Sequence, residues 1–343
     1  MSQKSDVGSC EARRRVLVTG GSGSIGLALA RYHGHEFEIH SVSRGPDAIQ
    51  MLSEQYPDVR THQVDIRDGE GLKNLFLTVR PDIVIHAAAL KHVNQAEVKP
   101  TLAVEINVLG TLNVVNASIA AKVPVSVAIS TDKACQPDNI YGYTKKITEQ
   151  VWLEHHRPDT RFVCARFANV ASSDGSVIPL WINSALAGQT LKLTDSRMNR
   201  LMFTPKQAIE LVNLSIDFAL MYDEPFVLAR IMKAVNMLEL ANVISAEFGD
   251  GRAPEIVGVR PGERLNEVLV SQAELGFAYR TQDRKHIMLH SNAAGVGRLT
   301  EELSSLTADY MNKTEIRELY ADYVKSRSIG IRGESEVRQV NRG

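Results

Sequence analysis

A tyrosine and a lysine four residues apart, Tyr141 and Lys145, are the first residues in this sequence that could do chemistry. A spacing of four places both side chains on one face of a helix. A neighbouring ammonium makes a phenol more acidic, so the pair could take a proton from a hydroxyl group while hydride leaves the carbon. The same stretch, "STDKACQPDNIYGYTKK" (residues 130–146), also holds Asp132 and Lys133. They are either an ordinary surface pair at a strand end or a second acid and base beside the first.

Glycines recur in the stretch "VLVTGGSGSIG", residues 16–26, which contains a G-x-G-x-x-G pattern. An apolar strand precedes the loop and a helix-like run follows it, which is the context of a dinucleotide-binding loop. The backbone could approach a pyrophosphate closely there, and the helix N-terminus supplies N–H donors and a positive dipole. The alternative is a structural glycine-rich turn. The predicted cofactor residues of the loop are Gly20, Gly23, Ser24, Ile25 and Gly26.

The strand after the loop ends in Ser43 and Arg44, without the acidic residue that usually reads the ribose in an NAD site. An arginine at this point suits a 2′-phosphate, which it can bind through charge-assisted hydrogen bonds. We therefore favour NADP over NAD, the alternative being a solvated surface arginine. Asp65 and Ile66 follow the third strand, where the adenine edge is commonly held, although Asp65 could equally cap a loop.

These residues need a scaffold, and short apolar runs alternate with helix-like segments from residue 15 onward. Such alternation predicts an α/β fold, a Rossmann-type doubly wound parallel sheet with a smaller C-terminal substrate-binding lobe. The helix carrying Tyr141 is expected to start near Pro137, capped by Asp138 or Asn139. The expected strands are 15–20, 37–44, 60–65, 82–89, 123–130 and 161–167. The expected units are a flexible tail at 1–14, an NADP-binding domain at 15–170 to which 203–232 returns, a substrate lobe at 171–202 and 233–325, and a flexible tail at 326–343.

The composition narrows the class of protein. The 343 residues carry a formal charge of −1, so nothing favours nucleic acid or an anionic membrane surface as a partner. No run approaches the roughly 18–20 unbroken apolar residues of a spanning helix, and the polar first residues lack the apolar core of a secretory signal. The three cysteines have no metal-ligand spacing and cannot all pair. We therefore expect a cytoplasmic protein without metal or membrane partner.

Several motifs in this order and spacing resemble one family. They are "TGGSGSIG", "HAAALKHV", "STDKACQPDNIYGYTK", "RFANVASSDGSVIP", "TDSRMNR" and "RPGERLNEV". Over residues 15 to 285 the chain resembles the extended short-chain dehydrogenases that act on nucleotide sugars. Within them it is similar to the polysaccharide-biosynthesis (CapD-like) family, and most of all to its soluble inverting UDP-N-acetylglucosamine 4,6-dehydratases.

The resemblance implies a reaction. Oxidation at C4 of a UDP-N-acetylhexosamine acidifies the C5 proton, water leaves from C6, hydride returns to C6, and C5 is reprotonated on the opposite face. It implies that Lys133 is the C5 base and that Asp132, beside Thr131, assists the departing hydroxyl. Lys133 can be a base only with a lowered pKa, and Asp132 can be an acid only with a raised pKa.

Further residues follow from the same resemblance. Arginines match phosphate geometry, and Glu263 could accept hydrogen bonds from the uridine ribose. The implied substrate residues are Lys91, His92, Asn169, Ser176, Val177, Arg200, Arg260 and Glu263. The implied additional cofactor residues are Ala87, Ala88, Ala89 and Lys91, with Tyr141 and Lys145 at the nicotinamide ribose. The family also tends toward homo-oligomers.

The chain departs from the family pattern in places. The family usually has proline where Asn94 stands, threonine and phenylalanine near Asn199 and Leu201, and a small residue where Tyr143 stands. We expect these changes to lie near the sugar. They leave room for a 4-epimerase, a 4-keto reductase or a 5,6-dehydratase on the same fold. A non-catalytic NADP-binding protein is a third class, against which the two proton-transfer pairs argue.

Overall fold

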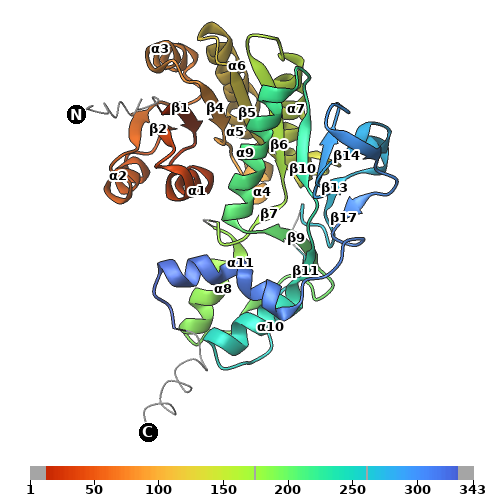
Figure 1. Cartoon of the computed structure of the whole chain (residues 1–343). Coiled ribbons are helices and arrows are strands. Elements are labelled where there is room, and N and C mark those ends of the chain that lie inside the picture. Colours follow the sequence, from red (N-terminus) through yellow and green to blue (C-terminus); the bar gives the residue numbers. More distant parts are fainter. Residues whose placement is uncertain (1–12, 174, 260–261, 331–343) are drawn as a thin grey trace, which may run out of the picture.

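A ten-stranded sheet forms the centre of the molecule (Figure 1). The computed structural model of the chain describes residues 13–173, 175–259 and 262–330. The expected Rossmann-type parallel sheet is confirmed, because every neighbouring pair from its β3 edge to β10 is parallel. These strands are, across the sheet, β3 (Arg60–Gln63), β2 (Phe37–Ser43), β1 (Arg14–Thr19), β4 (Ile83–His86), β5 (Val125–Thr131), β6 (Arg161–Phe167) and β10 (Val227–Arg230).

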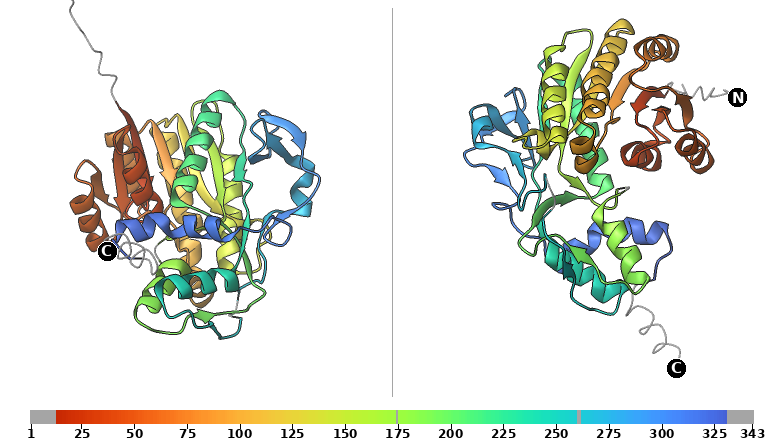
Figure 2. Two further views of the ribbon diagram at one scale, coloured as in Figure 1. Left: turned by 60° about the horizontal axis from the view of Figure 1, so that its bottom comes forward. Right: turned by 180° about the vertical axis from the view of Figure 1, so that it is seen from behind.

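Side chains alternate across the sheet and build a core on each face. In β1, Val16 and Val18 join one buried cluster and Leu17 joins the other, as the two-residue period of a strand requires. The first face is covered by α1 (Ser24–His33), α2 (Pro46–Gln55) and α9 (Pro205–Met221). The second face is covered by α3 (Gly69–Val79), α5 (Pro100–Val104), α6 (Gly110–Ala120) and α7 (Ile140–Glu154), and the view from behind brings α6 and α7 to the front (Figure 2).

The sheet continues beyond β10 with antiparallel strands. β15 (His286–Leu289) pairs with β10, and β14 (Ala278–Thr281) pairs with both β15 and β16 (Gly295–Arg298). The sequence analysis assigned residues 278–298 to the substrate lobe, whereas the structure adds them to the central sheet. Short loops join β14, β15 and β16, as antiparallel strands allow, and β15 covers the edge of β10 that would otherwise be unpaired.

A smaller lobe lies below the carboxyl ends of the parallel strands (Figure 1). Its core joins Trp181, Ile244, Phe248 and Tyr320. Its helices are α8 (Val177–Leu186), α10 (Met237–Phe248) and α11 (Lys313–Ser326). Its strand pairings are β7 (Asn169–Val170) and β11 (Ala234–Asn236) on either side of β9 (Asn199–Phe203), and β8 (Lys192–Leu193) with β12 (Glu255–Ile256). The pair β13 (Val268–Val270) and β17 (Leu303–Ser304) instead packs on the cores of the central sheet. The cleft between sheet edge and lobe is therefore the place for a ligand.

One helical run is longer and more apolar than the sequence analysis expected. α5, a π-helical segment (Glu105–Leu109) and α6 are continuous from Pro100 to Ala120, with a mean hydropathy of 1.4. By length and composition this run could cross a membrane. Half of it is buried inside the protein, where it packs against α3 and α7. Core helices pass the same test, so one such run is weak evidence for a membrane span.

Candidate active site

The glycine loop forms the floor of a cavity of about 640 Å³. Gly20 has a φ of +69°, and a Cβ on it would lie 2.8 Å from the backbone of Ala88. A Cβ on Gly26 would lie 2.0 Å from the carbonyl oxygen of Gly21. Only glycine fits at these two close approaches. Helix α1 starts at Ser24, directly after the loop, so its N-terminal N–H groups face the cavity as a dinucleotide pyrophosphate requires.

Most of the predicted cofactor residues line this cavity. Gly26 does not, because it packs behind the loop against Gly21. The lining residues that were predicted are Gly20, Gly23, Ser24, Ile25, Ser43, Arg44, Asp65, Ile66, Ala87, Ala88, Ala89, Lys91, Tyr141 and Lys145. The volume of this cavity and the close backbone approach that Gly20 allows together fit a nicotinamide dinucleotide.

Three predicted residues lie at the end of the cavity where we expect the adenosine, and each makes different contacts. The Ser43 hydroxyl accepts hydrogen bonds from the Ser22 backbone N–H (3.0 Å) and the Ser22 hydroxyl (2.8 Å), and so braces the glycine loop. Arg44 is exposed at the cavity wall. The Asp65 carboxylate accepts from Arg67 Nε at 3.1 Å and from Arg67 Nη2 at 2.8 Å. Asp65 therefore clamps its own loop, the alternative that the sequence left open, although it also lines the cavity.

Helix α7 presents Tyr141 and Lys145 to the same cavity. It begins at Ile140, later than the start expected near Pro137, because Asn139 is its N-cap and accepts from the Gly142 N–H at 2.8 Å. Glu97 Oε1 accepts from the Ile140 N–H at 2.7 Å and satisfies a second free donor of the first turn. The first turn of α7 is thus fixed on both sides.

The protonation of this pair differs from the expectation. Burial raises the pKa of Tyr141, and the cation that opposes this rise most strongly is Lys133 rather than Lys145. Lys145 Nζ instead donates to the Ile129 carbonyl at 2.7 Å. Burial lowers the pKa of Lys145 to about 8. The sequence predicted that Lys145 acidifies the phenol, but spacing along a helix does not reveal which cation the fold brings to it.

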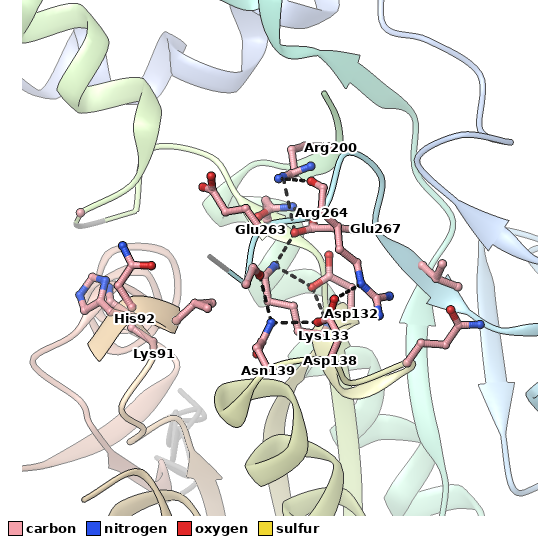
Figure 3. Close-up of a pocket in the computed structure, with 17 residues that line it drawn as sticks. Lys91, His92, Asp132, Lys133, Asp138, Asn139, Arg200, Glu263, Arg264 and Glu267 are labelled. Carbon is pink, nitrogen blue, oxygen red and sulfur yellow. Dashed lines mark hydrogen bonds and ion pairs between the residues drawn. The ribbon is translucent and has the colours of Figure 1, made fainter. Parts of the chain in front are cut away.

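Asp132 and Lys133 lie at the carboxyl end of β5, in a short 3-10 turn (Asp132–Ala134). Thr131 Oγ1 donates to Asp132 Oδ1 at 2.9 Å. Lys133 Nζ lies 3.2 Å from Asp132 Oδ1 and 2.8 Å from Glu267 Oε1 (Figure 3). Lys133 lines both the cofactor cavity and a second cavity next to it. The acid and amine therefore stand where the two cavities meet.

The groups around Asp132 and Lys133 raise the pKa of both residues, whereas a lowered pKa was expected for Lys133. Burial and then the neighbouring Glu267 raise the pKa of Asp132, as an acid requires. Burial disfavours the Lys133 ammonium, yet the Asp132 and Glu267 carboxylates outweigh it and raise the pKa of Lys133. The expected lowering of the Lys133 pKa is therefore wrong for this arrangement. Sequence reasoning gave Glu267 no role, and its only signal was a place at the end of the "RPGERLNEV" motif.

The second cavity has a volume of about 330 Å³ and opens between the sheet edge and the smaller lobe. Lys91 and His92 lie across it from Lys133 (Figure 3). Arg200 is buried, donates to the carbonyls of Arg264 (2.9 Å) and Leu265 (3.2 Å), and reaches the cavity wall. The predicted substrate residues in its lining are Lys91, His92, Asn169, Arg200 and Glu263.

Other predicted substrate residues lie elsewhere. Ser176 is the N-cap residue of α8 and Val177 its first residue, and neither lines the two cavities. Arg260 lies outside the described residues.

The departures from the family pattern are also scattered, contrary to the expectation that they lie near the sugar. Asn94 lines the second cavity. Asn199 is buried and donates to Asn266 Oδ1 at 3.0 Å, and Leu201 belongs to a hydrophobic core. Tyr143 is 51% exposed on the outer side of α7.

A buried asparagine ties the two halves of the site together. Asn107, in the π-helical segment, accepts from the Leu90 N–H at 2.7 Å and donates to the Thr144 hydroxyl at 3.0 Å. Its own carbonyl accepts from the hydroxyls of Thr111 (2.5 Å) and Thr148 (2.8 Å). A π-turn leaves a carbonyl without its usual helical partner, which these hydroxyls replace. The loop before Lys91 and helix α7 are thereby held at a fixed distance.

Comparison with known proteins gives consistent relatives. The profile of a family described as "Polysaccharide biosynthesis protein" matches residues 16–290. An inverting UDP-N-acetylglucosamine 4,6-dehydratase of Campylobacter jejuni is 31% identical over 281 residues, which cover 79% of this chain and 81% of the relative. A UDP-glucose 4-epimerase of Rickettsia bellii is 29% identical over 336 residues, covering 91% and 97%. The crystal structure of Pen from Bacillus thuringiensis is 28% identical, covers 90% of this chain and 97% of its own, and has a TM-score of 0.81.

Proposed function

The chain belongs to the polysaccharide biosynthesis protein family, and from this premise we propose that it is an NADP-dependent dehydratase of a UDP-N-acetylhexosamine. The most favoured substrate is UDP-N-acetylglucosamine, and the product is a 4-keto-6-deoxy sugar nucleotide inverted at C5. Relatives in this family act on nucleotide sugars, both as dehydratases and as epimerases. The observation that carries the dehydratase is the Asp132–Lys133 pair at the junction of the two cavities.

In this proposal the first step belongs to Tyr141. The phenol oxygen takes the proton of the C4 hydroxyl, assisted by the positive charge of Lys133 that favours its ionised form. Lys145 would hold the nicotinamide ribose from the same helix face. When bound, NADP supplies the acceptor for the C4 hydride and later the donor of hydride to C6. Arg44 would bind the 2′-phosphate from the exposed wall of the cavity.

The elimination step belongs to Asp132 and Lys133. The C4 ketone makes the C5 proton acidic. The Lys133 ammonium, whose side chain is 24% exposed, first releases its own proton to solvent in the second cavity, and the neutral amine then removes the C5 proton. Asp132, whose pKa is raised, carries the proton that the C6 hydroxyl needs to leave as water. Reprotonation of C5 on the opposite face then gives the inverted centre. An epimerase has no use for an acid and base at C5 and C6, so this pair favours the dehydratase.

The sugar nucleotide would occupy the second cavity. Its wall carries the cationic side chains Lys91, Lys133, Arg200 and Arg264, which suit a diphosphate. Glu263 and Asn169 offer hydrogen-bonding groups for ribose and sugar hydroxyls. We also retain Ser176, Val177 and Arg260 as substrate candidates, to be tested by substitution.

The test is incubation of the purified protein with UDP-N-acetylglucosamine and NADP in D2O, followed by proton NMR. We expect deuterium at C5 and a new methyl signal at C6, without net formation of NADPH. A C4 epimer that keeps its C6 hydroxyl, or net consumption of NADPH, would contradict the dehydratase.

A UDP-sugar 4-epimerase is the second candidate, because the Rickettsia relative shares 29% identity over nearly its whole length. It would use Tyr141 and Lys145 but not the Asp132–Lys133 pair. In D2O, an epimerase would incorporate no deuterium at C5. A 4-keto reductase would consume NADPH, and a 5,6-dehydratase would give an alkene signal in place of the methyl.

Assembly and location are further predictions. We propose that the protein is a homo-oligomer in the cytoplasm. Exposed apolar side chains on neighbouring helices support self-association, and they are Val98, Val104, Leu109, Leu112, Tyr143 and Ile147. Light scattering of the purified protein would test the oligomer, and fractionation of cells would test the location.

A further inference from the structure

Glu267 is a buried carboxylate that contacts two residues of the second cavity, Lys133 and Arg200. Its Oε1 lies 2.8 Å from Lys133 Nζ and 3.5 Å from Arg200 Nε. Its Oε2 accepts a hydrogen bond from Asn169 Nδ2 at 2.7 Å. The side chain is 7% exposed, so each of these contacts acts in a poorly screened environment. One oxygen atom thus bridges the amine of the elimination step and an arginine of the substrate cavity.

The backbone of Glu267 is fixed as well. Its N–H donates to the Ser305 hydroxyl at 2.9 Å, and its carbonyl accepts from the Ser305 N–H at 2.8 Å. β13 starts at the next residue and pairs with β17. The carboxylate is therefore presented by a rigid element, whereas Lys133 stands on a short turn after β5. A rigid partner for a long, flexible lysine determines where its nitrogen rests.

Among the described residues, the charged groups that act most strongly on Lys133 are the carboxyls of Asp132 and Glu267 and the guanidinium of Arg200, and Lys133 in turn acts on the phenol of Tyr141. Burial and Glu267 both raise the pKa of Asp132. Glu267 stays ionised, because Lys133 and Arg200 overcome its burial and hold its pKa well below the usual range. Glu267 is thus the carboxylate nearer to Lys133, at 2.8 Å against 3.2 Å for Asp132, and the one whose ionised form its surroundings favour.

We propose that Glu267 is the positioning residue of the elimination step: it holds the Lys133 nitrogen at the junction of the cavities and keeps it cationic until the sugar is bound. This rests on the proposed function of the site. A resting ammonium cannot remove protons from solvent or from a sugar that is not yet oxidised. Through the shared oxygen, a diphosphate that engages Arg200 also changes the surroundings of Lys133.

The test measures Lys133 directly. Reductive methylation with carbon-13 formaldehyde labels the lysines, and Lys133→Arg assigns the Lys133 signal in the NMR spectrum. We expect its titration midpoint to lie above that of an ordinary lysine. In Glu267→Gln, which keeps the size and the Asn169 contact, the midpoint should fall by about one pH unit or more, the usual effect of a contacting carboxylate. An unchanged or higher midpoint overturns the proposal.

Two further variants keep the result interpretable. Glu267→Asp retains a carboxylate farther from Lys133 and should give an intermediate midpoint, which also serves if Glu267→Gln does not fold. Asp138→Asn removes a carboxylate that lines the same cavity but contacts Arg264 rather than Lys133. It should leave the Lys133 midpoint unmoved. If the Lys133 midpoint fell equally in Asp138→Asn, the loss of any negative charge in the cavity would have the same effect, and the proposal would be overturned.

A kinetic readout separates this role from the reaction itself. In Glu267→Gln, the limb of the pH profile that reports Lys133 in C5 deuterium exchange should move to lower pH. The pH profile for formation of the C4 ketone should move less, because Tyr141 performs that step and Lys133 acts on it only through its charge. If the protein shows no dehydration with any sugar nucleotide, the proposed function fails while the titration still tests Glu267. If dehydration is normal and the titration does not respond, only the role of Glu267 fails.

Discussion

Arg166 and Glu149 face each other with both side chains completely shielded from solvent. Arg166 Nε donates to Glu149 Oε1 at 2.9 Å and Nη2 donates to Oε2 at 2.8 Å. The same guanidinium donates to Glu274 Oε1 at 2.9 Å, while Glu274 accepts from the Cys135 thiol. This network joins β6, helix α7 and the segment before β14. Through Cys135, the C-cap of the Asp132–Ala134 turn, it also reaches the turn that carries Lys133.

Glu149→Gln should therefore destabilise the protein strongly. It leaves part of the buried Arg166 charge unpaired, which costs about 3–5 kcal/mol in the free energy of unfolding. Urea unfolding followed by circular dichroism would measure the loss. Glu315→Gln, which removes the charge paired with the exposed Lys233 and keeps a side chain that can cap α11, is the matched control and should change the midpoint little. Equal effects in both variants would show that the buried network does not bear on stability.

Lys133→Ala should separate oxidation from elimination. We expect C4 oxidation to survive because Tyr141 and Lys145 remain, but to need a higher pH, since the Lys133 charge that favours the ionised phenol is lost. Dehydration should fall by about 10²- to 10⁴-fold, as for loss of a general base. NADPH absorbance in a single turnover reports the first step and C5 deuterium exchange reports the second. Lys192→Ala, an exposed lysine on β8, is the control. If Lys133→Ala dehydrates at the wild-type rate, Lys133 is not the base.

Arg44→Ala should weaken NADP selectively. Loss of a charge-assisted hydrogen bond to the 2′-phosphate costs about 1.5–3 kcal/mol, so the Kd for NADP should rise by about 10- to 100-fold while that for NAD stays constant. Fluorescence titration measures both constants. Arg67→Ala is a neighbouring control, because its guanidinium is already bound to Asp65. Parallel losses for the two cofactors in Arg44→Ala would remove the basis for preferring NADP.

Lys145→Met should stabilise the fold at neutral pH. Burial lowers the pKa of Lys145 to about 8, below the 10.5 of a free lysine, so the folded state carries an unfavourable charge. This cost is fully present below about pH 8 and fades as the pH rises toward 10.5, because the unfolded chain then binds the proton more tightly. We expect a gain of about 1–3 kcal/mol at pH 7, together with loss of activity. Thermal melts from pH 7 to 10.5 test this, and a gain that stays constant with pH would contradict it.

The sequence predicted those features that depend on residues close together along the chain. Apolar runs predicted the parallel strands, the spacing of glycines predicted the cofactor cavity, and the cap candidates included Asn139. It did not predict Glu267, which reaches Lys133 from a distant segment of the chain. It also missed the antiparallel strands beside β10. Both depend on which distant segments meet, and neither periodicity nor spacing carries that information.

Helix α7 has one face toward the cofactor cavity and another toward the outside of the protein. Tyr141 and Lys145 face the cofactor cavity, whereas Tyr143 and Ile147 are 51% and 46% exposed on the other side. Alternate positions of one short motif therefore have different neighbours: one set lines the cavity and the other faces the outside of the protein. A comparison of relatives that treats this stretch as one motif would mix the cavity-lining positions with the exposed positions. A comparison that treats the two faces of the helix separately would distinguish relatives that differ at the site from those that differ only at the surface.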